Sequence, residues 1–268
     1  MTRCRRRCVS AIRGQGSGFL LLMGVAFLSL RPLPAAAYVI LTERVGGKIG
    51  AYYWSVEEMP ISLVVDGGES GLGDIEVLPF VEEELRKWEE APYAFVRFAV
   101  EGMTQEDIDV ETLEDESSPF LLIGDHRQEI IFDPDGEILS WLGLDPGSIL
   151  GLGYPVVEGA DPEVPGPFTG EIIDGFVLIN TSGEQDPESV KATLIHEVGH
   201  FLGLGHTPFW LSLVGDDENG DGHVSLNEID FSRVPTMFPF ALPDDALANT
   251  LEPDDIAAIS ALYPEPDF

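Results

Sequence analysis

The chain has 268 residues, enough for one substantial hydrophobic core or at most two small ones. Its 44% apolar content argues against global disorder. Acidic residues outnumber basic ones by 48 to 14, a net charge of −34 that disfavours binding to nucleic acid or anionic lipid and favours divalent cations. Most of these carboxylates are expected only to keep the surface solvated.

Residues 1–37 are predicted to be a secretory signal peptide. An Arg-rich stretch, Met1 to Gly18, precedes an apolar run from Phe19 to Leu30 that is too short to span a bilayer. Ala35-Ala36-Ala37 then supplies an A-x-A cleavage site, so the mature chain is expected to begin near Tyr38. The protein is therefore expected to be secreted, with the periplasm as the alternative destination, and to keep no stable membrane anchor after cleavage.

Both cysteines, Cys4 and Cys8, lie in the segment expected to be removed. An exported chain without cysteine has no disulfide to stabilise it outside the cell. Bound metal is the obvious substitute for such a cross-link.

The first part of the mature chain predicts a strand, a helix and a second strand. Trp54 to Val65 is rich in β-forming residues and ends at Asp66-Gly67-Gly68, which is typical of a strand followed by a turn. Asp74 to Glu90 has apolar residues at helical spacing, which predicts a helix with one face in the core. Ala94 to Val100 follows as the second strand.

The middle of the chain is predicted to hold further strands. Glu101 to Ser118 is acidic and indicates a surface loop or a short helix. Asp133-Pro134-Asp135-Gly136 is predicted to be a turn, with ion binding as the less favoured alternative. The strand-like segments are the pieces Leu121 to Asp125 and Glu129 to Phe132, taken together as one strand, and then Ser148 to Val157 and Ile172 to Asn180.

A second long helix is predicted to begin at Asp186, with Pro187 in its first position, and to end near Gly203. The expected order is therefore β-α-β-β-β-β-α. No internal repeat and no linker indicates a second domain, so residues 38–268 are expected to form one domain.

This helix carries the pattern H-E-x-x-H-x-x-G-x-x-H at His196, Glu197, His200, Gly203 and His206. Residues four apart share one helix face, so the first two histidines can point at one ion. The glycine permits a positive φ, after which the third histidine can return as a ligand. Three imidazoles with an open position are typical of one catalytic Zn²⁺, and the glutamate then lies beside the metal as general base. The alternative is a coincidence of histidines on a buried helix.

A second metal signal lies at residues 217–228, which have the spacing of an EF-hand calcium loop. A glycine stands at loop position six, where the turn is sharp, and no paired second loop is present. We expect at least one structural Ca²⁺; an acidic turn in an acidic protein is the alternative. The expected ligands are Asp217, Asn219, Asp221, the backbone carbonyl of His223, Ser225 and Glu228.

The zinc motif resembles that of the metzincin zinc peptidases. Met237, within Val234–Phe240, resembles their Met-turn, and Leu251–Tyr263 resembles the C-terminal helix of the matrixins, the matrix-metalloproteinase-like branch. The resemblance covers nearly all of residues 50–264. It implies an α/β (α+β) zincin catalytic domain with a twisted, mostly parallel five-stranded sheet and about three helices.

The resemblance also implies how substrate binds. Ile149–Pro155 resembles the edge strand that pairs with an extended peptide through backbone groups, here those of Gly151, Leu152, Gly153 and Tyr154. The pocket for the side chain after the scissile bond is implied beside His196 and the segment following Met237. The calcium loop before the Met-turn departs from the matrixin pattern. With only His126 and His223 spare, the second, structural zinc of matrixins is expected to be missing.

The sequence thus predicts a secreted, monomeric zinc metalloendopeptidase that acts on a protein or peptide substrate. A zinc-activated water, with Glu197 as general base, would hydrolyse the peptide bond. The alternative is a non-catalytic exported zinc- and calcium-binding module for adhesion or surface display. A third possibility is a protease whose calcium loop acts as a switch.

Overall fold

The computed structural model describes residues 38–114, 128–160, 166–183, 186–208, 230–240 and 249–266. Three predicted features lie outside the described residues: the signal peptide, the strand at 121–125 and the EF-hand-like loop at 217–228 with all of its expected ligands. Among the described residues, no helix has both the length and the apolar character needed to span a membrane.

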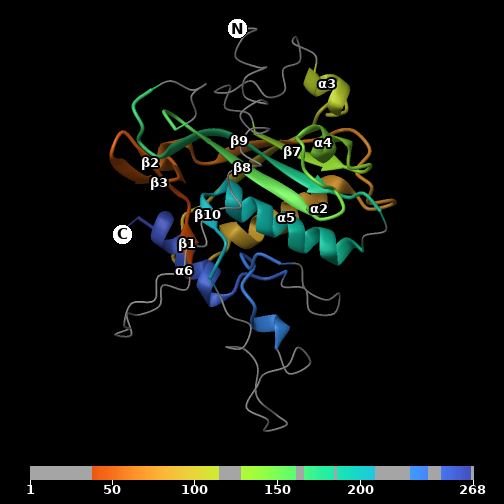
Figure 1. Ribbon diagram of the computed structural model, residues 1–268. Helices are drawn as coiled ribbons and strands as arrows, with labels where there is room; N and C mark the ends of the chain where they lie inside the picture. The colour runs from red at the N-terminus through yellow and green to blue at the C-terminus, as the bar shows by residue number, and fades with distance from the viewer. Residues whose placement is uncertain are drawn as a thin grey trace, which may run out of the picture.

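A six-stranded, mostly parallel sheet lies at the centre of the molecule (Figure 1). The order is β4-β9-β7-β5-β6, and β8 adds to β9 as the one antiparallel strand of this sheet. The strands are β4 (Tyr53–Trp54), β5 (Ile61–Val65), β6 (Phe98–Met103), β7 (Gln128–Asp133), β8 (Gly151–Val157) and β9 (Glu171–Asn180). The predicted α/β class with a mostly parallel sheet is confirmed. The count of five strands is wrong, because the two-residue β4 pairs beside the start of β9.

Five α-helices are described, compared with about three predicted. They are α2 (Val77–Glu89), α3 (Val110–Glu114), α4 (Glu137–Trp141), α5 (Pro187–Phe201) and α6 (Pro253–Leu262). The difference comes from α3 and α4, which have five residues each. α3 lies in the segment expected to be a surface loop or a short helix, whereas α4 is too short to show a helical period in the sequence.

The sheet is covered on both faces (Figure 1). Alternate residues of neighbouring strands enter different apolar clusters, as the two-residue period of a strand requires. Ile130 and Val177 belong to the large cluster that includes α2 and α5. Ile131 and Leu178 belong to a smaller cluster with α4. The helix bearing the histidines is thus packed against one face of a doubly covered sheet.

The observed ends of two strands and one helix differ from the predicted ends. The single strand expected at 54–65 is divided, because Ser55 caps a 3-10 turn, η1 (Val56–Glu58), between β4 and β5. The strand expected at 94–100 begins at Phe98 and continues to Met103. The helix expected from Asp74 begins at Val77.

Short N-terminal strands were not predicted from the sequence. β2 (Thr42–Val45) and β3 (Lys48–Ala51) form an antiparallel hairpin outside the main sheet. β1 (Val39–Ile40) pairs antiparallel with β10 (Leu204–Gly205), which immediately precedes His206. The beginning of the described chain therefore contacts the segment that carries the third histidine.

Candidate metal centre

Helix α5 begins and ends at sequence signals. The Asp186 side chain caps its first turn by accepting from the N–H groups of Glu188 and Ser189, and Pro187 follows as predicted. At the other end Gly203 has φ +94°, and a Cβ there would lie 2.3 Å from the carbonyl oxygen of Tyr52. Glycine is therefore required for the chain to leave the helix and enter β10.

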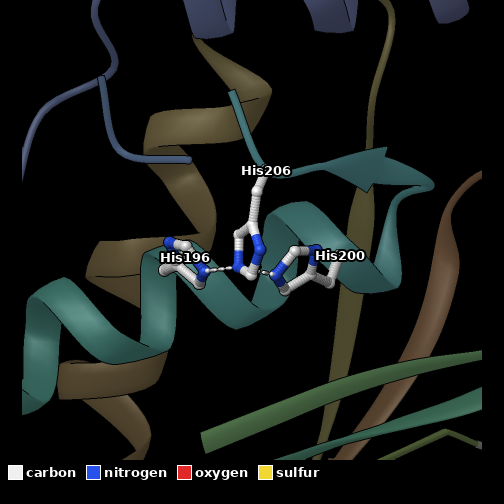
Figure 2. A group of neighbouring side chains, drawn as sticks. All are labelled: His196, His200 and His206. Carbon is white, nitrogen blue, oxygen red and sulfur yellow. Dashed lines mark hydrogen bonds between the residues drawn. The ribbon is translucent and has the colours of Figure 1, made fainter. Parts of the chain in front are cut away.

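Three imidazole rings converge beside α5 (Figure 2). His196 and His200 project from α5, and His206 reaches them from the segment after β10. The Nε2 atom of His206 lies 3.2 Å from that of His196 and 3.1 Å from that of His200. All three candidate ligand atoms lie within 4.8 Å of one another. The structure thus brings together the three histidines of the sequence motif, and they could hold a metal ion.

Backbone carbonyl groups orient the two helical rings. The Nδ1 of His196 lies 2.6 Å from the Thr236 oxygen, and the Nδ1 of His200 lies 2.8 Å from the Leu204 oxygen. A carbonyl can only accept a hydrogen bond, so Nδ1 carries the proton in both rings. The lone pair of each Nε2 is then free to face the centre of the cluster, as metal ligation requires.

The electrostatics of the cluster also suit ligation. Burial lowers the pKa of both His196 and His200 to about 4, and it lowers the pKa of His206 as well. The rings are therefore neutral at neutral pH. His206 is exposed while the other two rings are half-buried, so solvent reaches the cluster from the side of His206.

Glu197 lies on the same helix but contacts strand β8. The residue is 7% exposed, and its Oε2 accepts a hydrogen bond of 2.7 Å from the Gly153 N–H. Burial raises the pKa of Glu197, opposed in part by His200 and by this hydrogen bond. A carboxyl group with a raised pKa is suited to accept and return a proton near neutral pH.

The predicted substrate strand, Gly151 to Tyr154, lies within β8, antiparallel to β9. Two glycines let it approach α5 closely. A Cβ on Gly151 would lie 2.6 Å from the Glu197 Cγ, and one on Gly153 would lie 2.0 Å from the Glu197 carbonyl oxygen. Larger residues would separate β8 from the helix that carries the histidines.

Met237 lies against the same helix. It is 2% exposed, and a Cβ added to Gly199 would lie 2.3 Å from its sulfur. The segment around it is held by Asp255 of α6, whose carboxylate accepts from the N–H groups of Thr236, Met237 and Glu252. Because the Thr236 carbonyl accepts from His196, α6 is linked to the first histidine through this segment.

Asp255 lies in the segment that resembles the matrixin C-terminal helix, and the sequence pattern assigns it no role of its own. The signal that could have found its role is the capping box that it forms with Glu252. Three further side chains, also missed, donate to carbonyl oxygens of the chain around the histidines. They are Trp88 to Ile195 at 3.0 Å, Trp54 to Phe201 at 3.0 Å and Tyr263 to Leu202 at 2.7 Å.

The expected calcium ligands, Asp217 to Glu228, lie outside the described residues, as do His126 and His223. Comparison with known proteins adds no relative, because no protein-family model matches the chain and no curated protein matches it. The functional conclusion therefore depends on the residues of the site.

Proposed function

We propose that the protein is a secreted zinc-dependent endopeptidase of the metzincin type, resembling the matrixin branch. One observation carries the proposal. Three neutral imidazole nitrogens converge at 3.1 and 3.2 Å on the solvent side of α5, next to the buried carboxylate of Glu197.

The ligand set fits zinc. Tetrahedral zinc with Zn–N bonds of 2.0–2.1 Å separates its nitrogen ligands by about 3.3 to 3.4 Å. The two distances from His206 Nε2 are close to that value. Calcium and magnesium prefer oxygen ligands, which the three histidines do not offer. Three protein ligands also leave a fourth position open, as a catalytic rather than a structural site requires.

Zinc bound here would supply a Lewis acid that polarises a peptide carbonyl and acidifies a water molecule. The chain supplies the proton transfer: Glu197 takes a proton from the attacking water and returns it to the leaving amine. Its raised pKa makes the carboxylate a stronger base and so favours the first of these transfers. The Nδ1 hydrogen bonds of His196 and His200 hold the rings in one orientation throughout.

Strand β8 supplies the substrate site in this proposal. It has β9 on one side, so its other edge can pair with an extended peptide through backbone hydrogen bonds. The absence of side chains at Gly151 and Gly153 brings this edge close to Glu197. A protein or peptide is therefore the substrate, and the acidic surface disfavours nucleic acid.

The packing around the site supports the metzincin part of the proposal. The sheet has one antiparallel strand at an edge, next to the helix with the histidines, and a buried methionine lies against that helix. Export of a monomer, and a structural Ca²⁺ at residues 217–228, belong to the same proposal and rest on the sequence pattern alone.

Metal analysis combined with a peptide-library digest tests the proposal. Wild type and Glu197→Ala should each hold one zinc, whereas His206→Ala should lose it. Wild type should cleave peptides at least about 100-fold faster than Glu197→Ala. Equal cleavage by the two proteins contradicts the role of Glu197. Zinc-loaded wild type that cleaves no peptide favours the non-catalytic adhesion module instead.

A further inference from the structure

Among the described residues no strand pairs with the other edge of β8, and this open edge offers few hydrogen-bond donors. The Asn180 N–H donates to the Leu150 carbonyl across the ladder at 2.9 Å. Antiparallel pairing alternates, so Leu152 and Tyr154 also direct their backbone groups toward β9, while Gly151 and Gly153 direct theirs away from it. Pro155, next on the outward side, has no N–H. From Gly151 to Pro155, the outward donors are therefore the amides of the two glycines.

One of these two amides is already bonded to the proposed general base. The Gly153 N–H donates to the Glu197 carboxylate at 2.7 Å, a distance typical of a charge-assisted hydrogen bond. The carboxylate is buried, with 7% of the residue exposed, so this amide replaces water as a partner. An incoming peptide that pairs along β8 needs the same N–H for one of its carbonyl oxygens.

We propose that the Gly153–Glu197 hydrogen bond is a latch that a paired substrate opens. In the resting site Glu197 occupies an amide of the substrate strand. When a peptide carbonyl takes that amide, Glu197 loses its partner and turns to the attacking water. The base is thus released when a peptide lies along β8. This inference rests on the proposed function and adds a substrate-dependent control to it.

The latch predicts an unusual direction for a mutational effect. Removing the carboxylate should strengthen peptide binding, because the Gly153 amide no longer has a competing acceptor. Glu197→Ala should bind the peptide about tenfold more tightly than wild type does, given the usual strength of hydrogen bonds to charged groups. Glu197→Gln keeps a neutral acceptor and should fall between the two.

The binding experiment uses the zinc-loaded full chain and a peptide chosen from the library digest. The peptide is capped at both ends, so charge repulsion with Glu197 plays no part, and a ketomethylene group replaces its scissile bond. Calorimetric titration gives Kd for wild type, Glu197→Gln and Glu197→Ala. Matched peptides, each with one carbonyl reduced to a methylene, locate the contact. The gain on removing Glu197 should vanish for the peptide that lacks the carbonyl paired with Gly153, and should persist for the others.

Two further readouts are independent of that comparison. The amide proton of Gly153 should move upfield in Glu197→Ala, because it loses a carboxylate acceptor. Cleavable peptides too short to reach Gly153 should have a lower kcat and not only a higher KM, since they bind without releasing the base.

The outcomes separate the two proposals. Equal or weaker binding by Glu197→Ala, while wild type still cleaves peptides, overturns the latch and leaves the endopeptidase standing. An unmoved Gly153 resonance also overturns the latch. A wild type that neither binds nor cleaves peptides overturns both. If Glu197→Ala fails to fold, Glu197→Gln must show the intermediate gain, and an unchanged Kd then overturns the latch.

Discussion

The three histidines of the site are held in two different ways. His196 and His200 lie on α5, a helix whose packing and hydrogen bonds fix their separation before any metal binds. His206 follows β10, a two-residue strand whose partner is the equally short β1. Beside that ladder, the Leu41 N–H donates to the Gly203 carbonyl at 2.8 Å.

Local structure therefore places two of the histidines, whereas long-range contacts place the third. Four-residue spacing on a helix pre-positions two ligands, whereas the third depends on chain segments more than 150 residues apart that meet beside the site. His196 should therefore tolerate changes at the N-terminal strands and His206 should not. His200 should be affected less than His206, through the Leu204 carbonyl of β10 that bonds to its Nδ1. The predictions below test this contrast, from the largest expected effect to the smallest.

The largest effect is expected at Asp255, which acts on the helical side of the site. Asp255→Ala leaves three N–H groups without an acceptor, two of them buried and one partly buried, and should reduce the free energy of unfolding by about 3 kcal/mol. It should also weaken zinc binding, because the Thr236 carbonyl that orients His196 is no longer fixed. Urea unfolding and chelator competition measure both effects. Asp254→Ala is the matched control; Asp254 accepts from the Thr207 hydroxyl, and its loss should cost about 1 kcal/mol. Equal effects at the two positions would contradict this role.

A smaller effect is expected at Tyr263, which follows α6 and links β4 to the end of α5. Its hydroxyl donates to the Leu202 carbonyl and accepts from the Trp54 N–H. Tyr263→Phe keeps the ring but leaves these two buried groups unpaired, so stability should fall by about 2 kcal/mol. Zinc affinity should hardly change, because neither group bonds to a histidine. A large loss of zinc affinity would show that the end of α5 controls the ligands.

The parts of this site that could be predicted are those encoded locally. The Asp186-Pro187 start of α5, the histidine spacing and the exit at Gly203 all have short-range physical causes, and the structure agrees with them. The parts that could not be predicted depend on partners distant in sequence. Glu197 and Gly153 are 44 residues apart, and Asp255 lies 18 residues from Met237. No periodicity in the sequence indicates such distant pairs.

The short strands could not be predicted from the sequence for the same reason. A two-residue strand such as β1 or β10 has no alternation to read, and it exists because a partner is adjacent.

Asn180 is a related case: it begins a glycosylation sequon, yet it is 1% exposed. Its side-chain amide donates to the carbonyls of Pro146 and Ile149 and so holds the segment that leads into β8. Only the packed structure distinguishes this role from a surface modification site.

The contrast between the ligands is tested directly at Leu41. Leu41→Pro removes the N–H that bonds to Gly203 and should disturb β1 and β10. The change should displace His206 most, reach His200 only through the Leu204 carbonyl, and leave His196 in place. Zinc should bind about tenfold more weakly, as when a group that orients a ligand is lost. Leu41→Ala keeps the backbone donor and serves as the control. In cobalt-substituted protein, a changed absorption spectrum for the proline variant alone would report a displaced His206. Unchanged affinity would mean that β1 does not position this ligand.

The smallest effect concerns pH and sharpens the role of Asp255. Burial raises the pKa of this carboxyl to about 6, compared with an ordinary value of 3.8. Between these values the folded chain binds the proton that the unfolded chain has released. This group therefore adds stability as pH falls from 6 toward 4, and that contribution is lost as pH rises through 6. Asp255→Ala lacks this contribution, so its stability deficit relative to wild type should widen by about 1 kcal/mol between pH 7 and about pH 5.3. In metal-free protein, His196 and His200 act in the opposite sense. Their pKa of about 4 lies below the ordinary 6.5, so their contribution is lost as pH falls through that range in wild type and variant alike. Because the histidine term cancels in the difference between the two proteins, urea unfolding of both at the two pH values isolates the carboxyl. A deficit that narrows on acidification would mean that Asp255 is ionised throughout and acts as a charged acceptor.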